Sequence, residues 1–141
     1  MHTIHFYFDF SLPAARQAFA ELPQQLLGAS YLVRYFPLGS TAAARAAWER
    51  AGVWGTPNRY VCACLFAGKT PENAPPGADA AAAPARQQHA EAAARAAGVQ
   101  HLPALTVSGL EGQVFTLPQD WAALRAQLAV PGEGADTSTQ I

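Results

Sequence analysis

The sequence has little cysteine, little lysine and no long apolar run, and each shortage excludes a class of protein. Its 141 residues include two cysteines and one lysine, and the formal net charge is −1. Two cysteines are too few for the disulfide framework of a small secreted domain. The near-neutral charge predicts no surface for nucleic acid or for an anionic membrane. No stretch approaches the roughly 20 apolar residues of a membrane span, so we expect neither nucleic acid nor membrane as a partner.

The first ten residues, MHTIHFYFDF, lack the basic region that opens a signal peptide. As written, the sequence therefore predicts a cytoplasmic protein, or a periplasmic one if a leader has been removed. The chain length is typical of one domain that buries roughly two thirds of its unfolded surface. The oligomeric state stays open.

Periodicity predicts a first half of the form β-α-β. Residues 3–10 are aromatic and β-branched, as in a buried strand. Residues 12–22 place apolar side chains at helical spacing, and Pro23 is expected to interrupt that helix. Residues 30–38 predict the second strand.

The middle of the chain predicts helices. Residues 40–52 form one, with Ser40 as the expected N-cap, and a second is expected to begin at Thr56 as cap with Pro57 in the first turn. A proline-rich loop, 70–84, precedes a helix over 85–99.

The last part of the chain predicts a β-β-α unit: strands over 103–109 and 112–117, then a helix over 117–129. The order β-α-β, helices, β-β-α predicts an α/β fold with a helical insertion at about 40–98 between its two halves. We expect a domain over 1–130 and a flexible tail over 131–141.

Two stretches carry a family resemblance. FYFDFSLPAA resembles the strand and active-site turn of thioredoxin-fold disulfide proteins, in which an aspartate stands three positions before a C-P-x-C motif. Asp9 matches that aspartate, and Leu12-Pro13-Ala14-Ala15 falls on the motif. VQHLPALTV resembles the strand that these proteins enter through a cis-proline, which would be Pro103. The segment 46–73 and the closing 109–128 are similar to the helical insertion and the terminal hairpin and helix of DsbC/DsbG-type isomerases.

The resemblance implies a degenerate member of the family. A disulfide enzyme needs a thiolate at the helix N-terminus and a second thiol one turn later. Because Leu12 and Ala15 carry no sulfur, dithiol chemistry at this turn is excluded. We expect no metal site and no cofactor, and we interpret Cys62 and Cys64 as packing residues on a helix.

What the resemblance leaves is a binding groove. In thioredoxin-like proteins the residue before the cis-proline pairs with the backbone of an extended substrate, which requires no cysteine. The expected partner is therefore an extended peptide or protein segment, and the expected role is non-catalytic or chaperone-like. The expected groove residues are Ser11, Leu12, Pro13, His101, Leu102 and Pro103.

A second resemblance gives an alternative function. FYFDFSLPAA also resembles the start of kappa-class glutathione transferases and 2-hydroxychromene-2-carboxylate isomerases, which carry F-D-F-x-S-P. In those enzymes the serine before the proline meets the sulfur of glutathione. Here Leu12 occupies that place and Ser11 stands one position early. The alternative is a glutathione-dependent transferase or isomerase that uses Ser11.

Overall fold

The computed structural model describes residues 1–128. Two short 3-10 turns, η1 (Gly52–Trp54) and η2 (Ala80–Ala82), accompany the main elements. The main elements are β1 (His2–Asp9), α1 (Pro13–Gln25), β2 (Tyr31–Leu38), α2 (Ala42–Glu49), α3 (Arg59–Phe66), α4 (Ala83–Ala96), β3 (Ala104–Val107), β4 (Phe115–Thr116) and α5 (Trp121–Gln127). The expected tail lies outside the described residues, so it and the boundary at residue 130 stay predictions.

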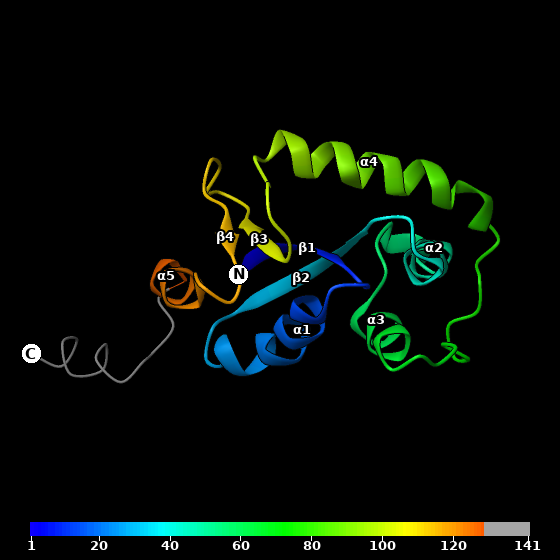
Figure 1. Ribbon diagram of the computed structural model, residues 1–141, viewed down its shortest axis with the longest axis horizontal. Helices are drawn as coiled ribbons and strands as arrows, with labels where there is room; N and C mark the ends of the chain where they lie inside the picture. The colour runs from blue at the N-terminus through cyan, green and yellow to red at the C-terminus, as the bar shows by residue number, and fades with distance from the viewer. Residues whose placement is uncertain (129–141) are drawn as a thin grey trace, which may run out of the picture.

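The strands form one mixed sheet in the order β2-β1-β3-β4. β1 and β2 run parallel, as a strand, crossover helix and strand must, and β3 is antiparallel to both β1 and β4. Helices α2, α3 and α4 lie between β2 and β3 in the chain. This helical segment therefore separates the β-α-β part of the sequence from the β-β-α part. Figure 1 shows α1 and α3 on one side of the strands and α4 on the other.

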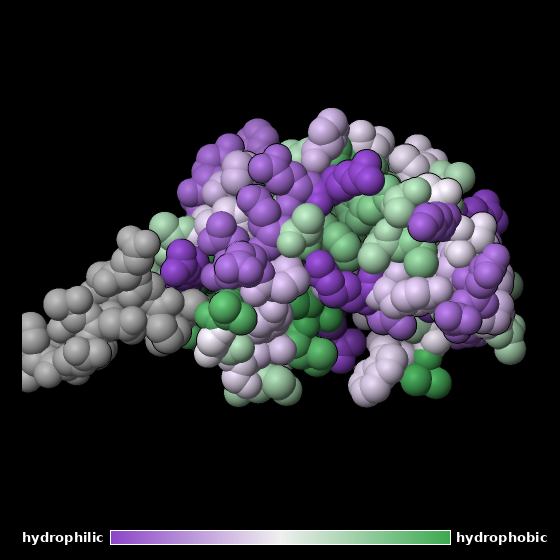
Figure 2. All heavy atoms as spheres, turned by 90° about the horizontal axis from the view of Figure 1, so that it is seen from below, coloured by the Kyte–Doolittle hydropathy of each residue, from purple (hydrophilic) through white to green (hydrophobic). Residues whose placement is uncertain are grey.

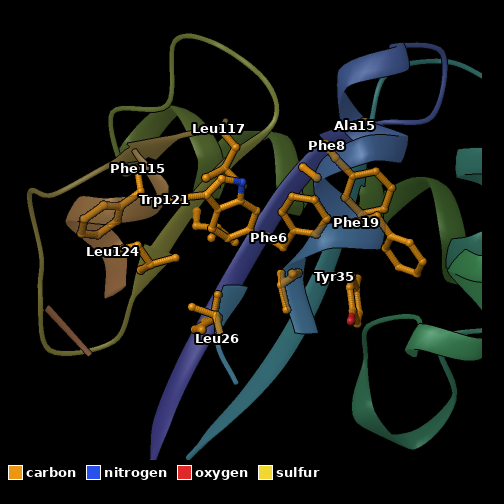
Figure 3. Packing of buried hydrophobic residues seen from close by; sticks show 14 of the residues in the cluster. Phe6, Phe8, Ala15, Phe19, Leu26, Tyr35, Phe115, Leu117, Trp121 and Leu124 are labelled. Carbon is orange, nitrogen blue, oxygen red and sulfur yellow. The ribbon is translucent and has the colours of Figure 1, made fainter. Parts of the chain in front are cut away.

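Alternate residues of β1 supply the two cores. Ile4, Phe6 and Phe8 are fully buried on the face toward α1 and α5, and the rings of Phe6 and Phe8 stack with centroids 4.9 Å apart. In Figure 3, Trp121 approaches this layer from α5 while Phe19 approaches it from α1. Burying these large side chains removes their apolar surface from water, which stabilises this half of the fold.

The opposite face of the sheet carries a smaller core that α2 and α4 cover. Tyr7 and Trp48 are buried there against the alanines of α4, including Ala90 and Ala94. Alanine lets the α4 backbone come close to the sheet because its side chain is a single methyl group. The indole Nε1 of Trp48 donates to the carbonyl oxygen of Pro37 at 2.9 Å.

Helix α1 continues beyond Pro23, and the expected interruption there was wrong. A proline inside a helix leaves the carbonyl oxygen four residues earlier without its N–H donor. That oxygen belongs to Phe19, and Nη2 of Arg59 donates to it at 3.0 Å. A side chain 40 residues away in the sequence thus replaces the missing helical hydrogen bond.

The two expected helix caps were also wrong. The N-cap of α2 is Thr41, whose Oγ1 accepts from the amide of Ala44, and the N-cap of α3 is Asn58, whose Oδ1 accepts from the amide of Val61. The expected caps, Ser40 and Thr56, have side chains that can cap a helix, but they stand one and two positions before the residues that do so. The side chain that reaches the amide three residues ahead decides the boundary.

Within residues 1–128, no helix has the length and hydropathy needed to cross a membrane.

Candidate functional site

The site expected from the sequence begins at a tight turn over Asp9–Leu12. Oδ1 of Asp9 accepts from the amide of Ser11 at 2.9 Å and from its Oγ at 2.7 Å. The amide of Leu12 donates to the carbonyl oxygen of Asp9 at 3.1 Å. Aspartate often closes turns in this way, by accepting from the backbone two residues ahead. The Ser11 hydroxyl is therefore held by a carboxylate that the sequence had not assigned to it.

After the turn, α1 starts at the segment that the sequence resemblance aligns with the C-P-x-C motif. Leu12 is the N-cap residue with extended backbone angles and no side-chain cap, and Pro13 follows in the first turn. Leu12 is 38% exposed, whereas Ala15 is fully buried in the larger core. Of the four motif positions, Leu12 therefore presents a large apolar side chain to solvent and Ala15 presents none.

Gly39, the residue directly after β2, lies against the carboxylate of Asp9. Its φ is +87°, and a Cβ placed on it would lie 2.5 Å from Oδ2 of Asp9. Gln87 of α4 donates from its side chain to the carbonyl oxygen of Gly39. Sequence reasoning missed both residues. Gly39 carried the weak signal of a glycine directly after a strand, and no sequence pattern links positions 39 and 87.

The second expected segment, His101–Pro103, enters β3. The Leu102–Pro103 peptide bond is cis, as the family resemblance implied. His101 is exposed, Leu102 is half-buried and packs against the smaller core, and Pro103 is buried. The side chain of Leu102 therefore contributes partly to packing, not wholly to a surface.

The topology brings the two segments to one end of the sheet. Ala104 pairs with Tyr7, so the residues just before β3 lie beside the last residues of β1, where the turn at Asp9 begins. Within residues 1–128, no hydrogen bond links the turn over 9–13 to the loop over 101–103. A groove lined by both segments stays a prediction.

The two cysteines lie on α3 and are not bonded to each other. Cys62 is fully buried in the larger core, and burial raises the pKa of its thiol far above the ordinary value. Cys64 is half-buried. Residues two apart on a helix point about 200° away from each other, which keeps the two sulfurs apart. A buried thiol that holds its proton is a poor nucleophile and a good packing group.

The part of the chain that the structure describes contains no cluster of three or more His, Cys, Asp or Glu side chains arranged to hold a metal ion. The polar groups gathered at the turn are one carboxylate, one hydroxyl and backbone amides. This set can orient a bound chain by hydrogen bonding. It offers no thiol for electron transfer.

No protein-family model matches the sequence, and neither does any curated protein. The fold is similar to the crystal structure of a thioredoxin-like oxidoreductase from Silicibacter pomeroyi, with a TM-score of 0.53 and 19% sequence identity. The match covers 92% of this chain and 88% of the other. It shows a mixed α/β fold, with a four-stranded mixed sheet, that resembles the thioredoxin-like fold. The chemistry of that oxidoreductase does not follow from the likeness.

Proposed function

We propose that this chain is a non-catalytic member of the thioredoxin-like proteins, of DsbC/DsbG-like architecture, that binds extended peptide or unfolded protein segments. One observation carries the proposal. An ordered turn, closed by Asp9 and Ser11, holds an exposed Leu12 at the position that the family resemblance aligns with the reactive thiol of a disulfide enzyme. The proposal takes this turn as the scaffold of such a site, with an apolar side chain in place of the reactive group.

The proposed groove runs between the Leu12–Pro13 turn and the loop ending at Pro103. Recognition of a substrate backbone beside the cis-proline depends on main-chain hydrogen bonds, and side-chain selectivity comes from the apolar walls. Such binding is reversible because no sulfur is present at positions 12–15 to form a mixed disulfide. A holding or accessory role follows from binding without covalent chemistry.

The test is suppression of aggregation. Insulin reduced by dithiothreitol precipitates as its B chain, and light scattering follows the precipitation. We expect the wild-type protein to delay scattering and Leu12→Glu to lose this effect, because a charge at the groove opposes apolar binding. Leu27→Glu is the matched control, since Leu27 is 70% exposed and lies beyond the other end of α1. Equal activity of the two variants, or none in the wild type, would refute the proposal.

The alternative function is a glutathione-dependent transferase or isomerase. The observation in its favour is that Ser11 is exposed and its hydroxyl is oriented by Asp9 at 2.7 Å. Calorimetric titration with glutathione separates the two proposals. Saturable heat that Ser11→Ala abolishes would favour the enzyme, and no heat in the wild type would favour the binding module.

A further inference from the structure

Strand β2 is an edge strand, and the hydrogen bonds on either side of it fix which of its residues face outward. The amide of His2 donates to the carbonyl oxygen of Ser30 at 3.0 Å, so Ser30 and every second residue after it face β1. The intervening residues, Tyr31, Val33, Tyr35 and Pro37, turn their backbone groups away from the sheet. The bond from the Trp48 indole to the carbonyl oxygen of Pro37 agrees with this assignment. It also explains how β2 holds a proline, because no ladder bond needs its missing N–H.

The outer edge of β2 is open at its start and closed at its end. Trp48 occupies the outward carbonyl of Pro37, and Tyr35 is only 4% exposed. Within residues 1–128, no hydrogen bond reaches the outward backbone groups of Tyr31 or Val33. A short edge of this kind is a template for strand addition.

Two pockets lie on the open edge. The first, which we call the tyrosine pocket, has a volume of about 320 Å³ and is lined by Leu22, Pro23, Tyr31, Tyr35 and Arg59. The second, the tryptophan pocket, has a volume of about 200 Å³ and is lined by Leu32, Arg34, Trp54, Thr56 and Pro57. Leu32, Val33 and Asn58 line both pockets.

Apart from these shared residues, the two pockets are lined by side chains from opposite faces of β2. Tyr31 and Tyr35 point toward α1, where Tyr35 packs against Phe19 with ring centroids 5.7 Å apart. Because successive side chains of a strand alternate, Leu32 and Arg34 point to the other face. An added strand would likewise send its alternate side chains into the two pockets.

The charge of the pockets selects the occupant. Among residues 1–128, Arg59 in the tyrosine pocket and Arg34 in the tryptophan pocket are the only charged side chains that line these pockets. In the described part of the chain, neither forms a salt bridge with a carboxylate. The nitrogen donors they use here go to neutral oxygens, such as the bond from Nη1 of Arg34 to the carbonyl of Trp54 at 3.2 Å. Each pocket thus combines apolar walls with one positive charge that lacks a counter-charge.

We propose that the open edge of β2 is a second recognition site, which adds an extended peptide rich in apolar and acidic residues as a further strand. Tyr31 and Val33 supply the main-chain hydrogen bonds. The carboxylates meet Arg34 and Arg59, and the apolar side chains fill the remainder of the pockets. A second copy of this chain fits the edge poorly, since its own β2 would bring arginines toward arginines.

The protein carries its own reporter for this site. Trp54 is 72% exposed, whereas Trp48 and Trp121 are 1% and 6% exposed, so a change in tryptophan emission on binding arises chiefly at Trp54. Figure 2, which views the molecule from the side of α1 and α3, shows strongly hydrophobic residues exposed in patches among hydrophilic ones. Covering Trp54 would move its emission to shorter wavelength.

The experiment titrates the full chain with the capped hexapeptide VVEEVV, whose two adjacent glutamates point to opposite faces of an added strand, and with its basic counterpart VVKKVV. We expect a saturable blue shift with the acidic peptide that weakens as salt rises, and binding of the basic peptide at least tenfold weaker. Arg34→Glu should weaken the acidic peptide about tenfold, and Arg95→Glu, the same charge change at the exposed end of α4, should leave it unchanged. Val33→Pro should weaken binding with the fold intact, because the lost N–H faces outward as at Pro37.

Equal binding of the two peptides, or unchanged binding by Arg34→Glu, would overturn the proposal. A blue shift that depends on protein concentration without peptide, together with a dimer in sedimentation, would assign the edge to a second copy instead. Leu12→Glu should leave this titration unaltered. The edge and the Leu12 groove therefore succeed or fail separately.

Discussion

Arg59 donates a hydrogen bond to the carbonyl oxygen of Phe19 at 3.0 Å, the oxygen that Pro23 deprives of its helical donor. The same guanidinium lies over the Phe19 ring, 4.1 Å from its centroid, and donates to the hydroxyl of Tyr35 at 3.2 Å. One side chain of α3 therefore completes α1 and ties both helices to β2.

This arrangement predicts a coupling between positions 59 and 23. Arg59→Met should lower the free energy of unfolding by about 1–3 kcal/mol, because the carbonyl of Phe19 loses its donor in a half-buried place. In a Pro23→Ala background the helix supplies its own donor, so the same change should be milder by about 1 kcal/mol. Urea unfolding of the four proteins measures the difference, and additive effects would show that Arg59 does not act through that oxygen.

Gly39 gives a second prediction, with a matched control. Gly39→Ala should lower stability by about 2–3 kcal/mol, because φ is positive and the new Cβ would collide with the Asp9 carboxylate. Gly55→Ala shares the positive φ but has nothing within 4 Å of its Cβ, so it should lower stability by only about 1 kcal/mol. Thermal unfolding of both variants compares them directly. Equal losses of stability in the two variants would mean that the collision of the new Cβ with the Asp9 carboxylate does not add to the cost of the positive φ.

Burial of Cys62 predicts how stability depends on pH. Burial raises the pKa of its thiol in the folded state, so the unfolded chain loses this proton at lower pH than the folded chain does. The stabilisation is complete below the unfolded pKa of about 8.5 and is lost as pH rises above it, by at most about 1.4 kcal/mol per pH unit. Urea unfolding between pH 8 and 10 measures the slope, and Cys62→Ala should flatten it. An unchanged slope would place the titrating group elsewhere.

The sequence predicted the order of the elements because that order rests on short-range patterns. The aromatic and β-branched run of β1 and the glycines and prolines between helices are visible within a few residues, whereas the cis-proline at 103 was expected from the family resemblance. The errors fell where a distant partner decides the outcome. Pro23 ends a helix in isolation, and only Arg59 explains why α1 continues.

The candidate site divides in the same way. The turn at Ser11–Pro13 and the loop at Leu102–Pro103 could be located from local motifs. Gly39 and Gln87 could not, because Gly39 meets Asp9, and Gln87 meets Gly39, only after β2 and α4 are in place. Likewise, the open edge of β2 depends on strand order, which no local pattern encodes.

The lack of thiols at the turn predicts the redox behaviour of the wild-type protein. It should not reduce insulin above background in the presence of a recycling reductant, because Cys62 is buried and Cys64 points away from it. Consumption of the reductant follows the reaction, because turbidity would also fall if the protein suppressed aggregation. A rate comparable to that of a C-x-x-C enzyme would direct attention to Cys62 and Cys64.

Introducing thiols at positions 12 and 15 should create a redox pair. The amide of Ala15 donates to the carbonyl oxygen of Leu12 at 3.0 Å, so the two residues are joined by the first turn of α1. Residues three apart on a helix lie about 5–6 Å apart, within the range that a disulfide accepts. We therefore expect Leu12→Cys with Ala15→Cys to form a reversible disulfide, and the helix N-terminus to lower the pKa of the thiol at position 12.

The experiment needs a background without the native thiols. Cys62→Ala is preferable to serine, because a hydroxyl in that fully buried apolar place would lack a partner, and Cys64→Ser completes it. Alkylation and mass spectrometry count the free thiols under mild oxidant. Leu12→Cys with Ala14→Cys is the control, since position 14 is exposed and points away from position 12. If the 12–15 pair stays reduced as the 12–14 pair does, the turn does not hold the geometry of a disulfide site, and the resemblance at this turn loses its chemical basis.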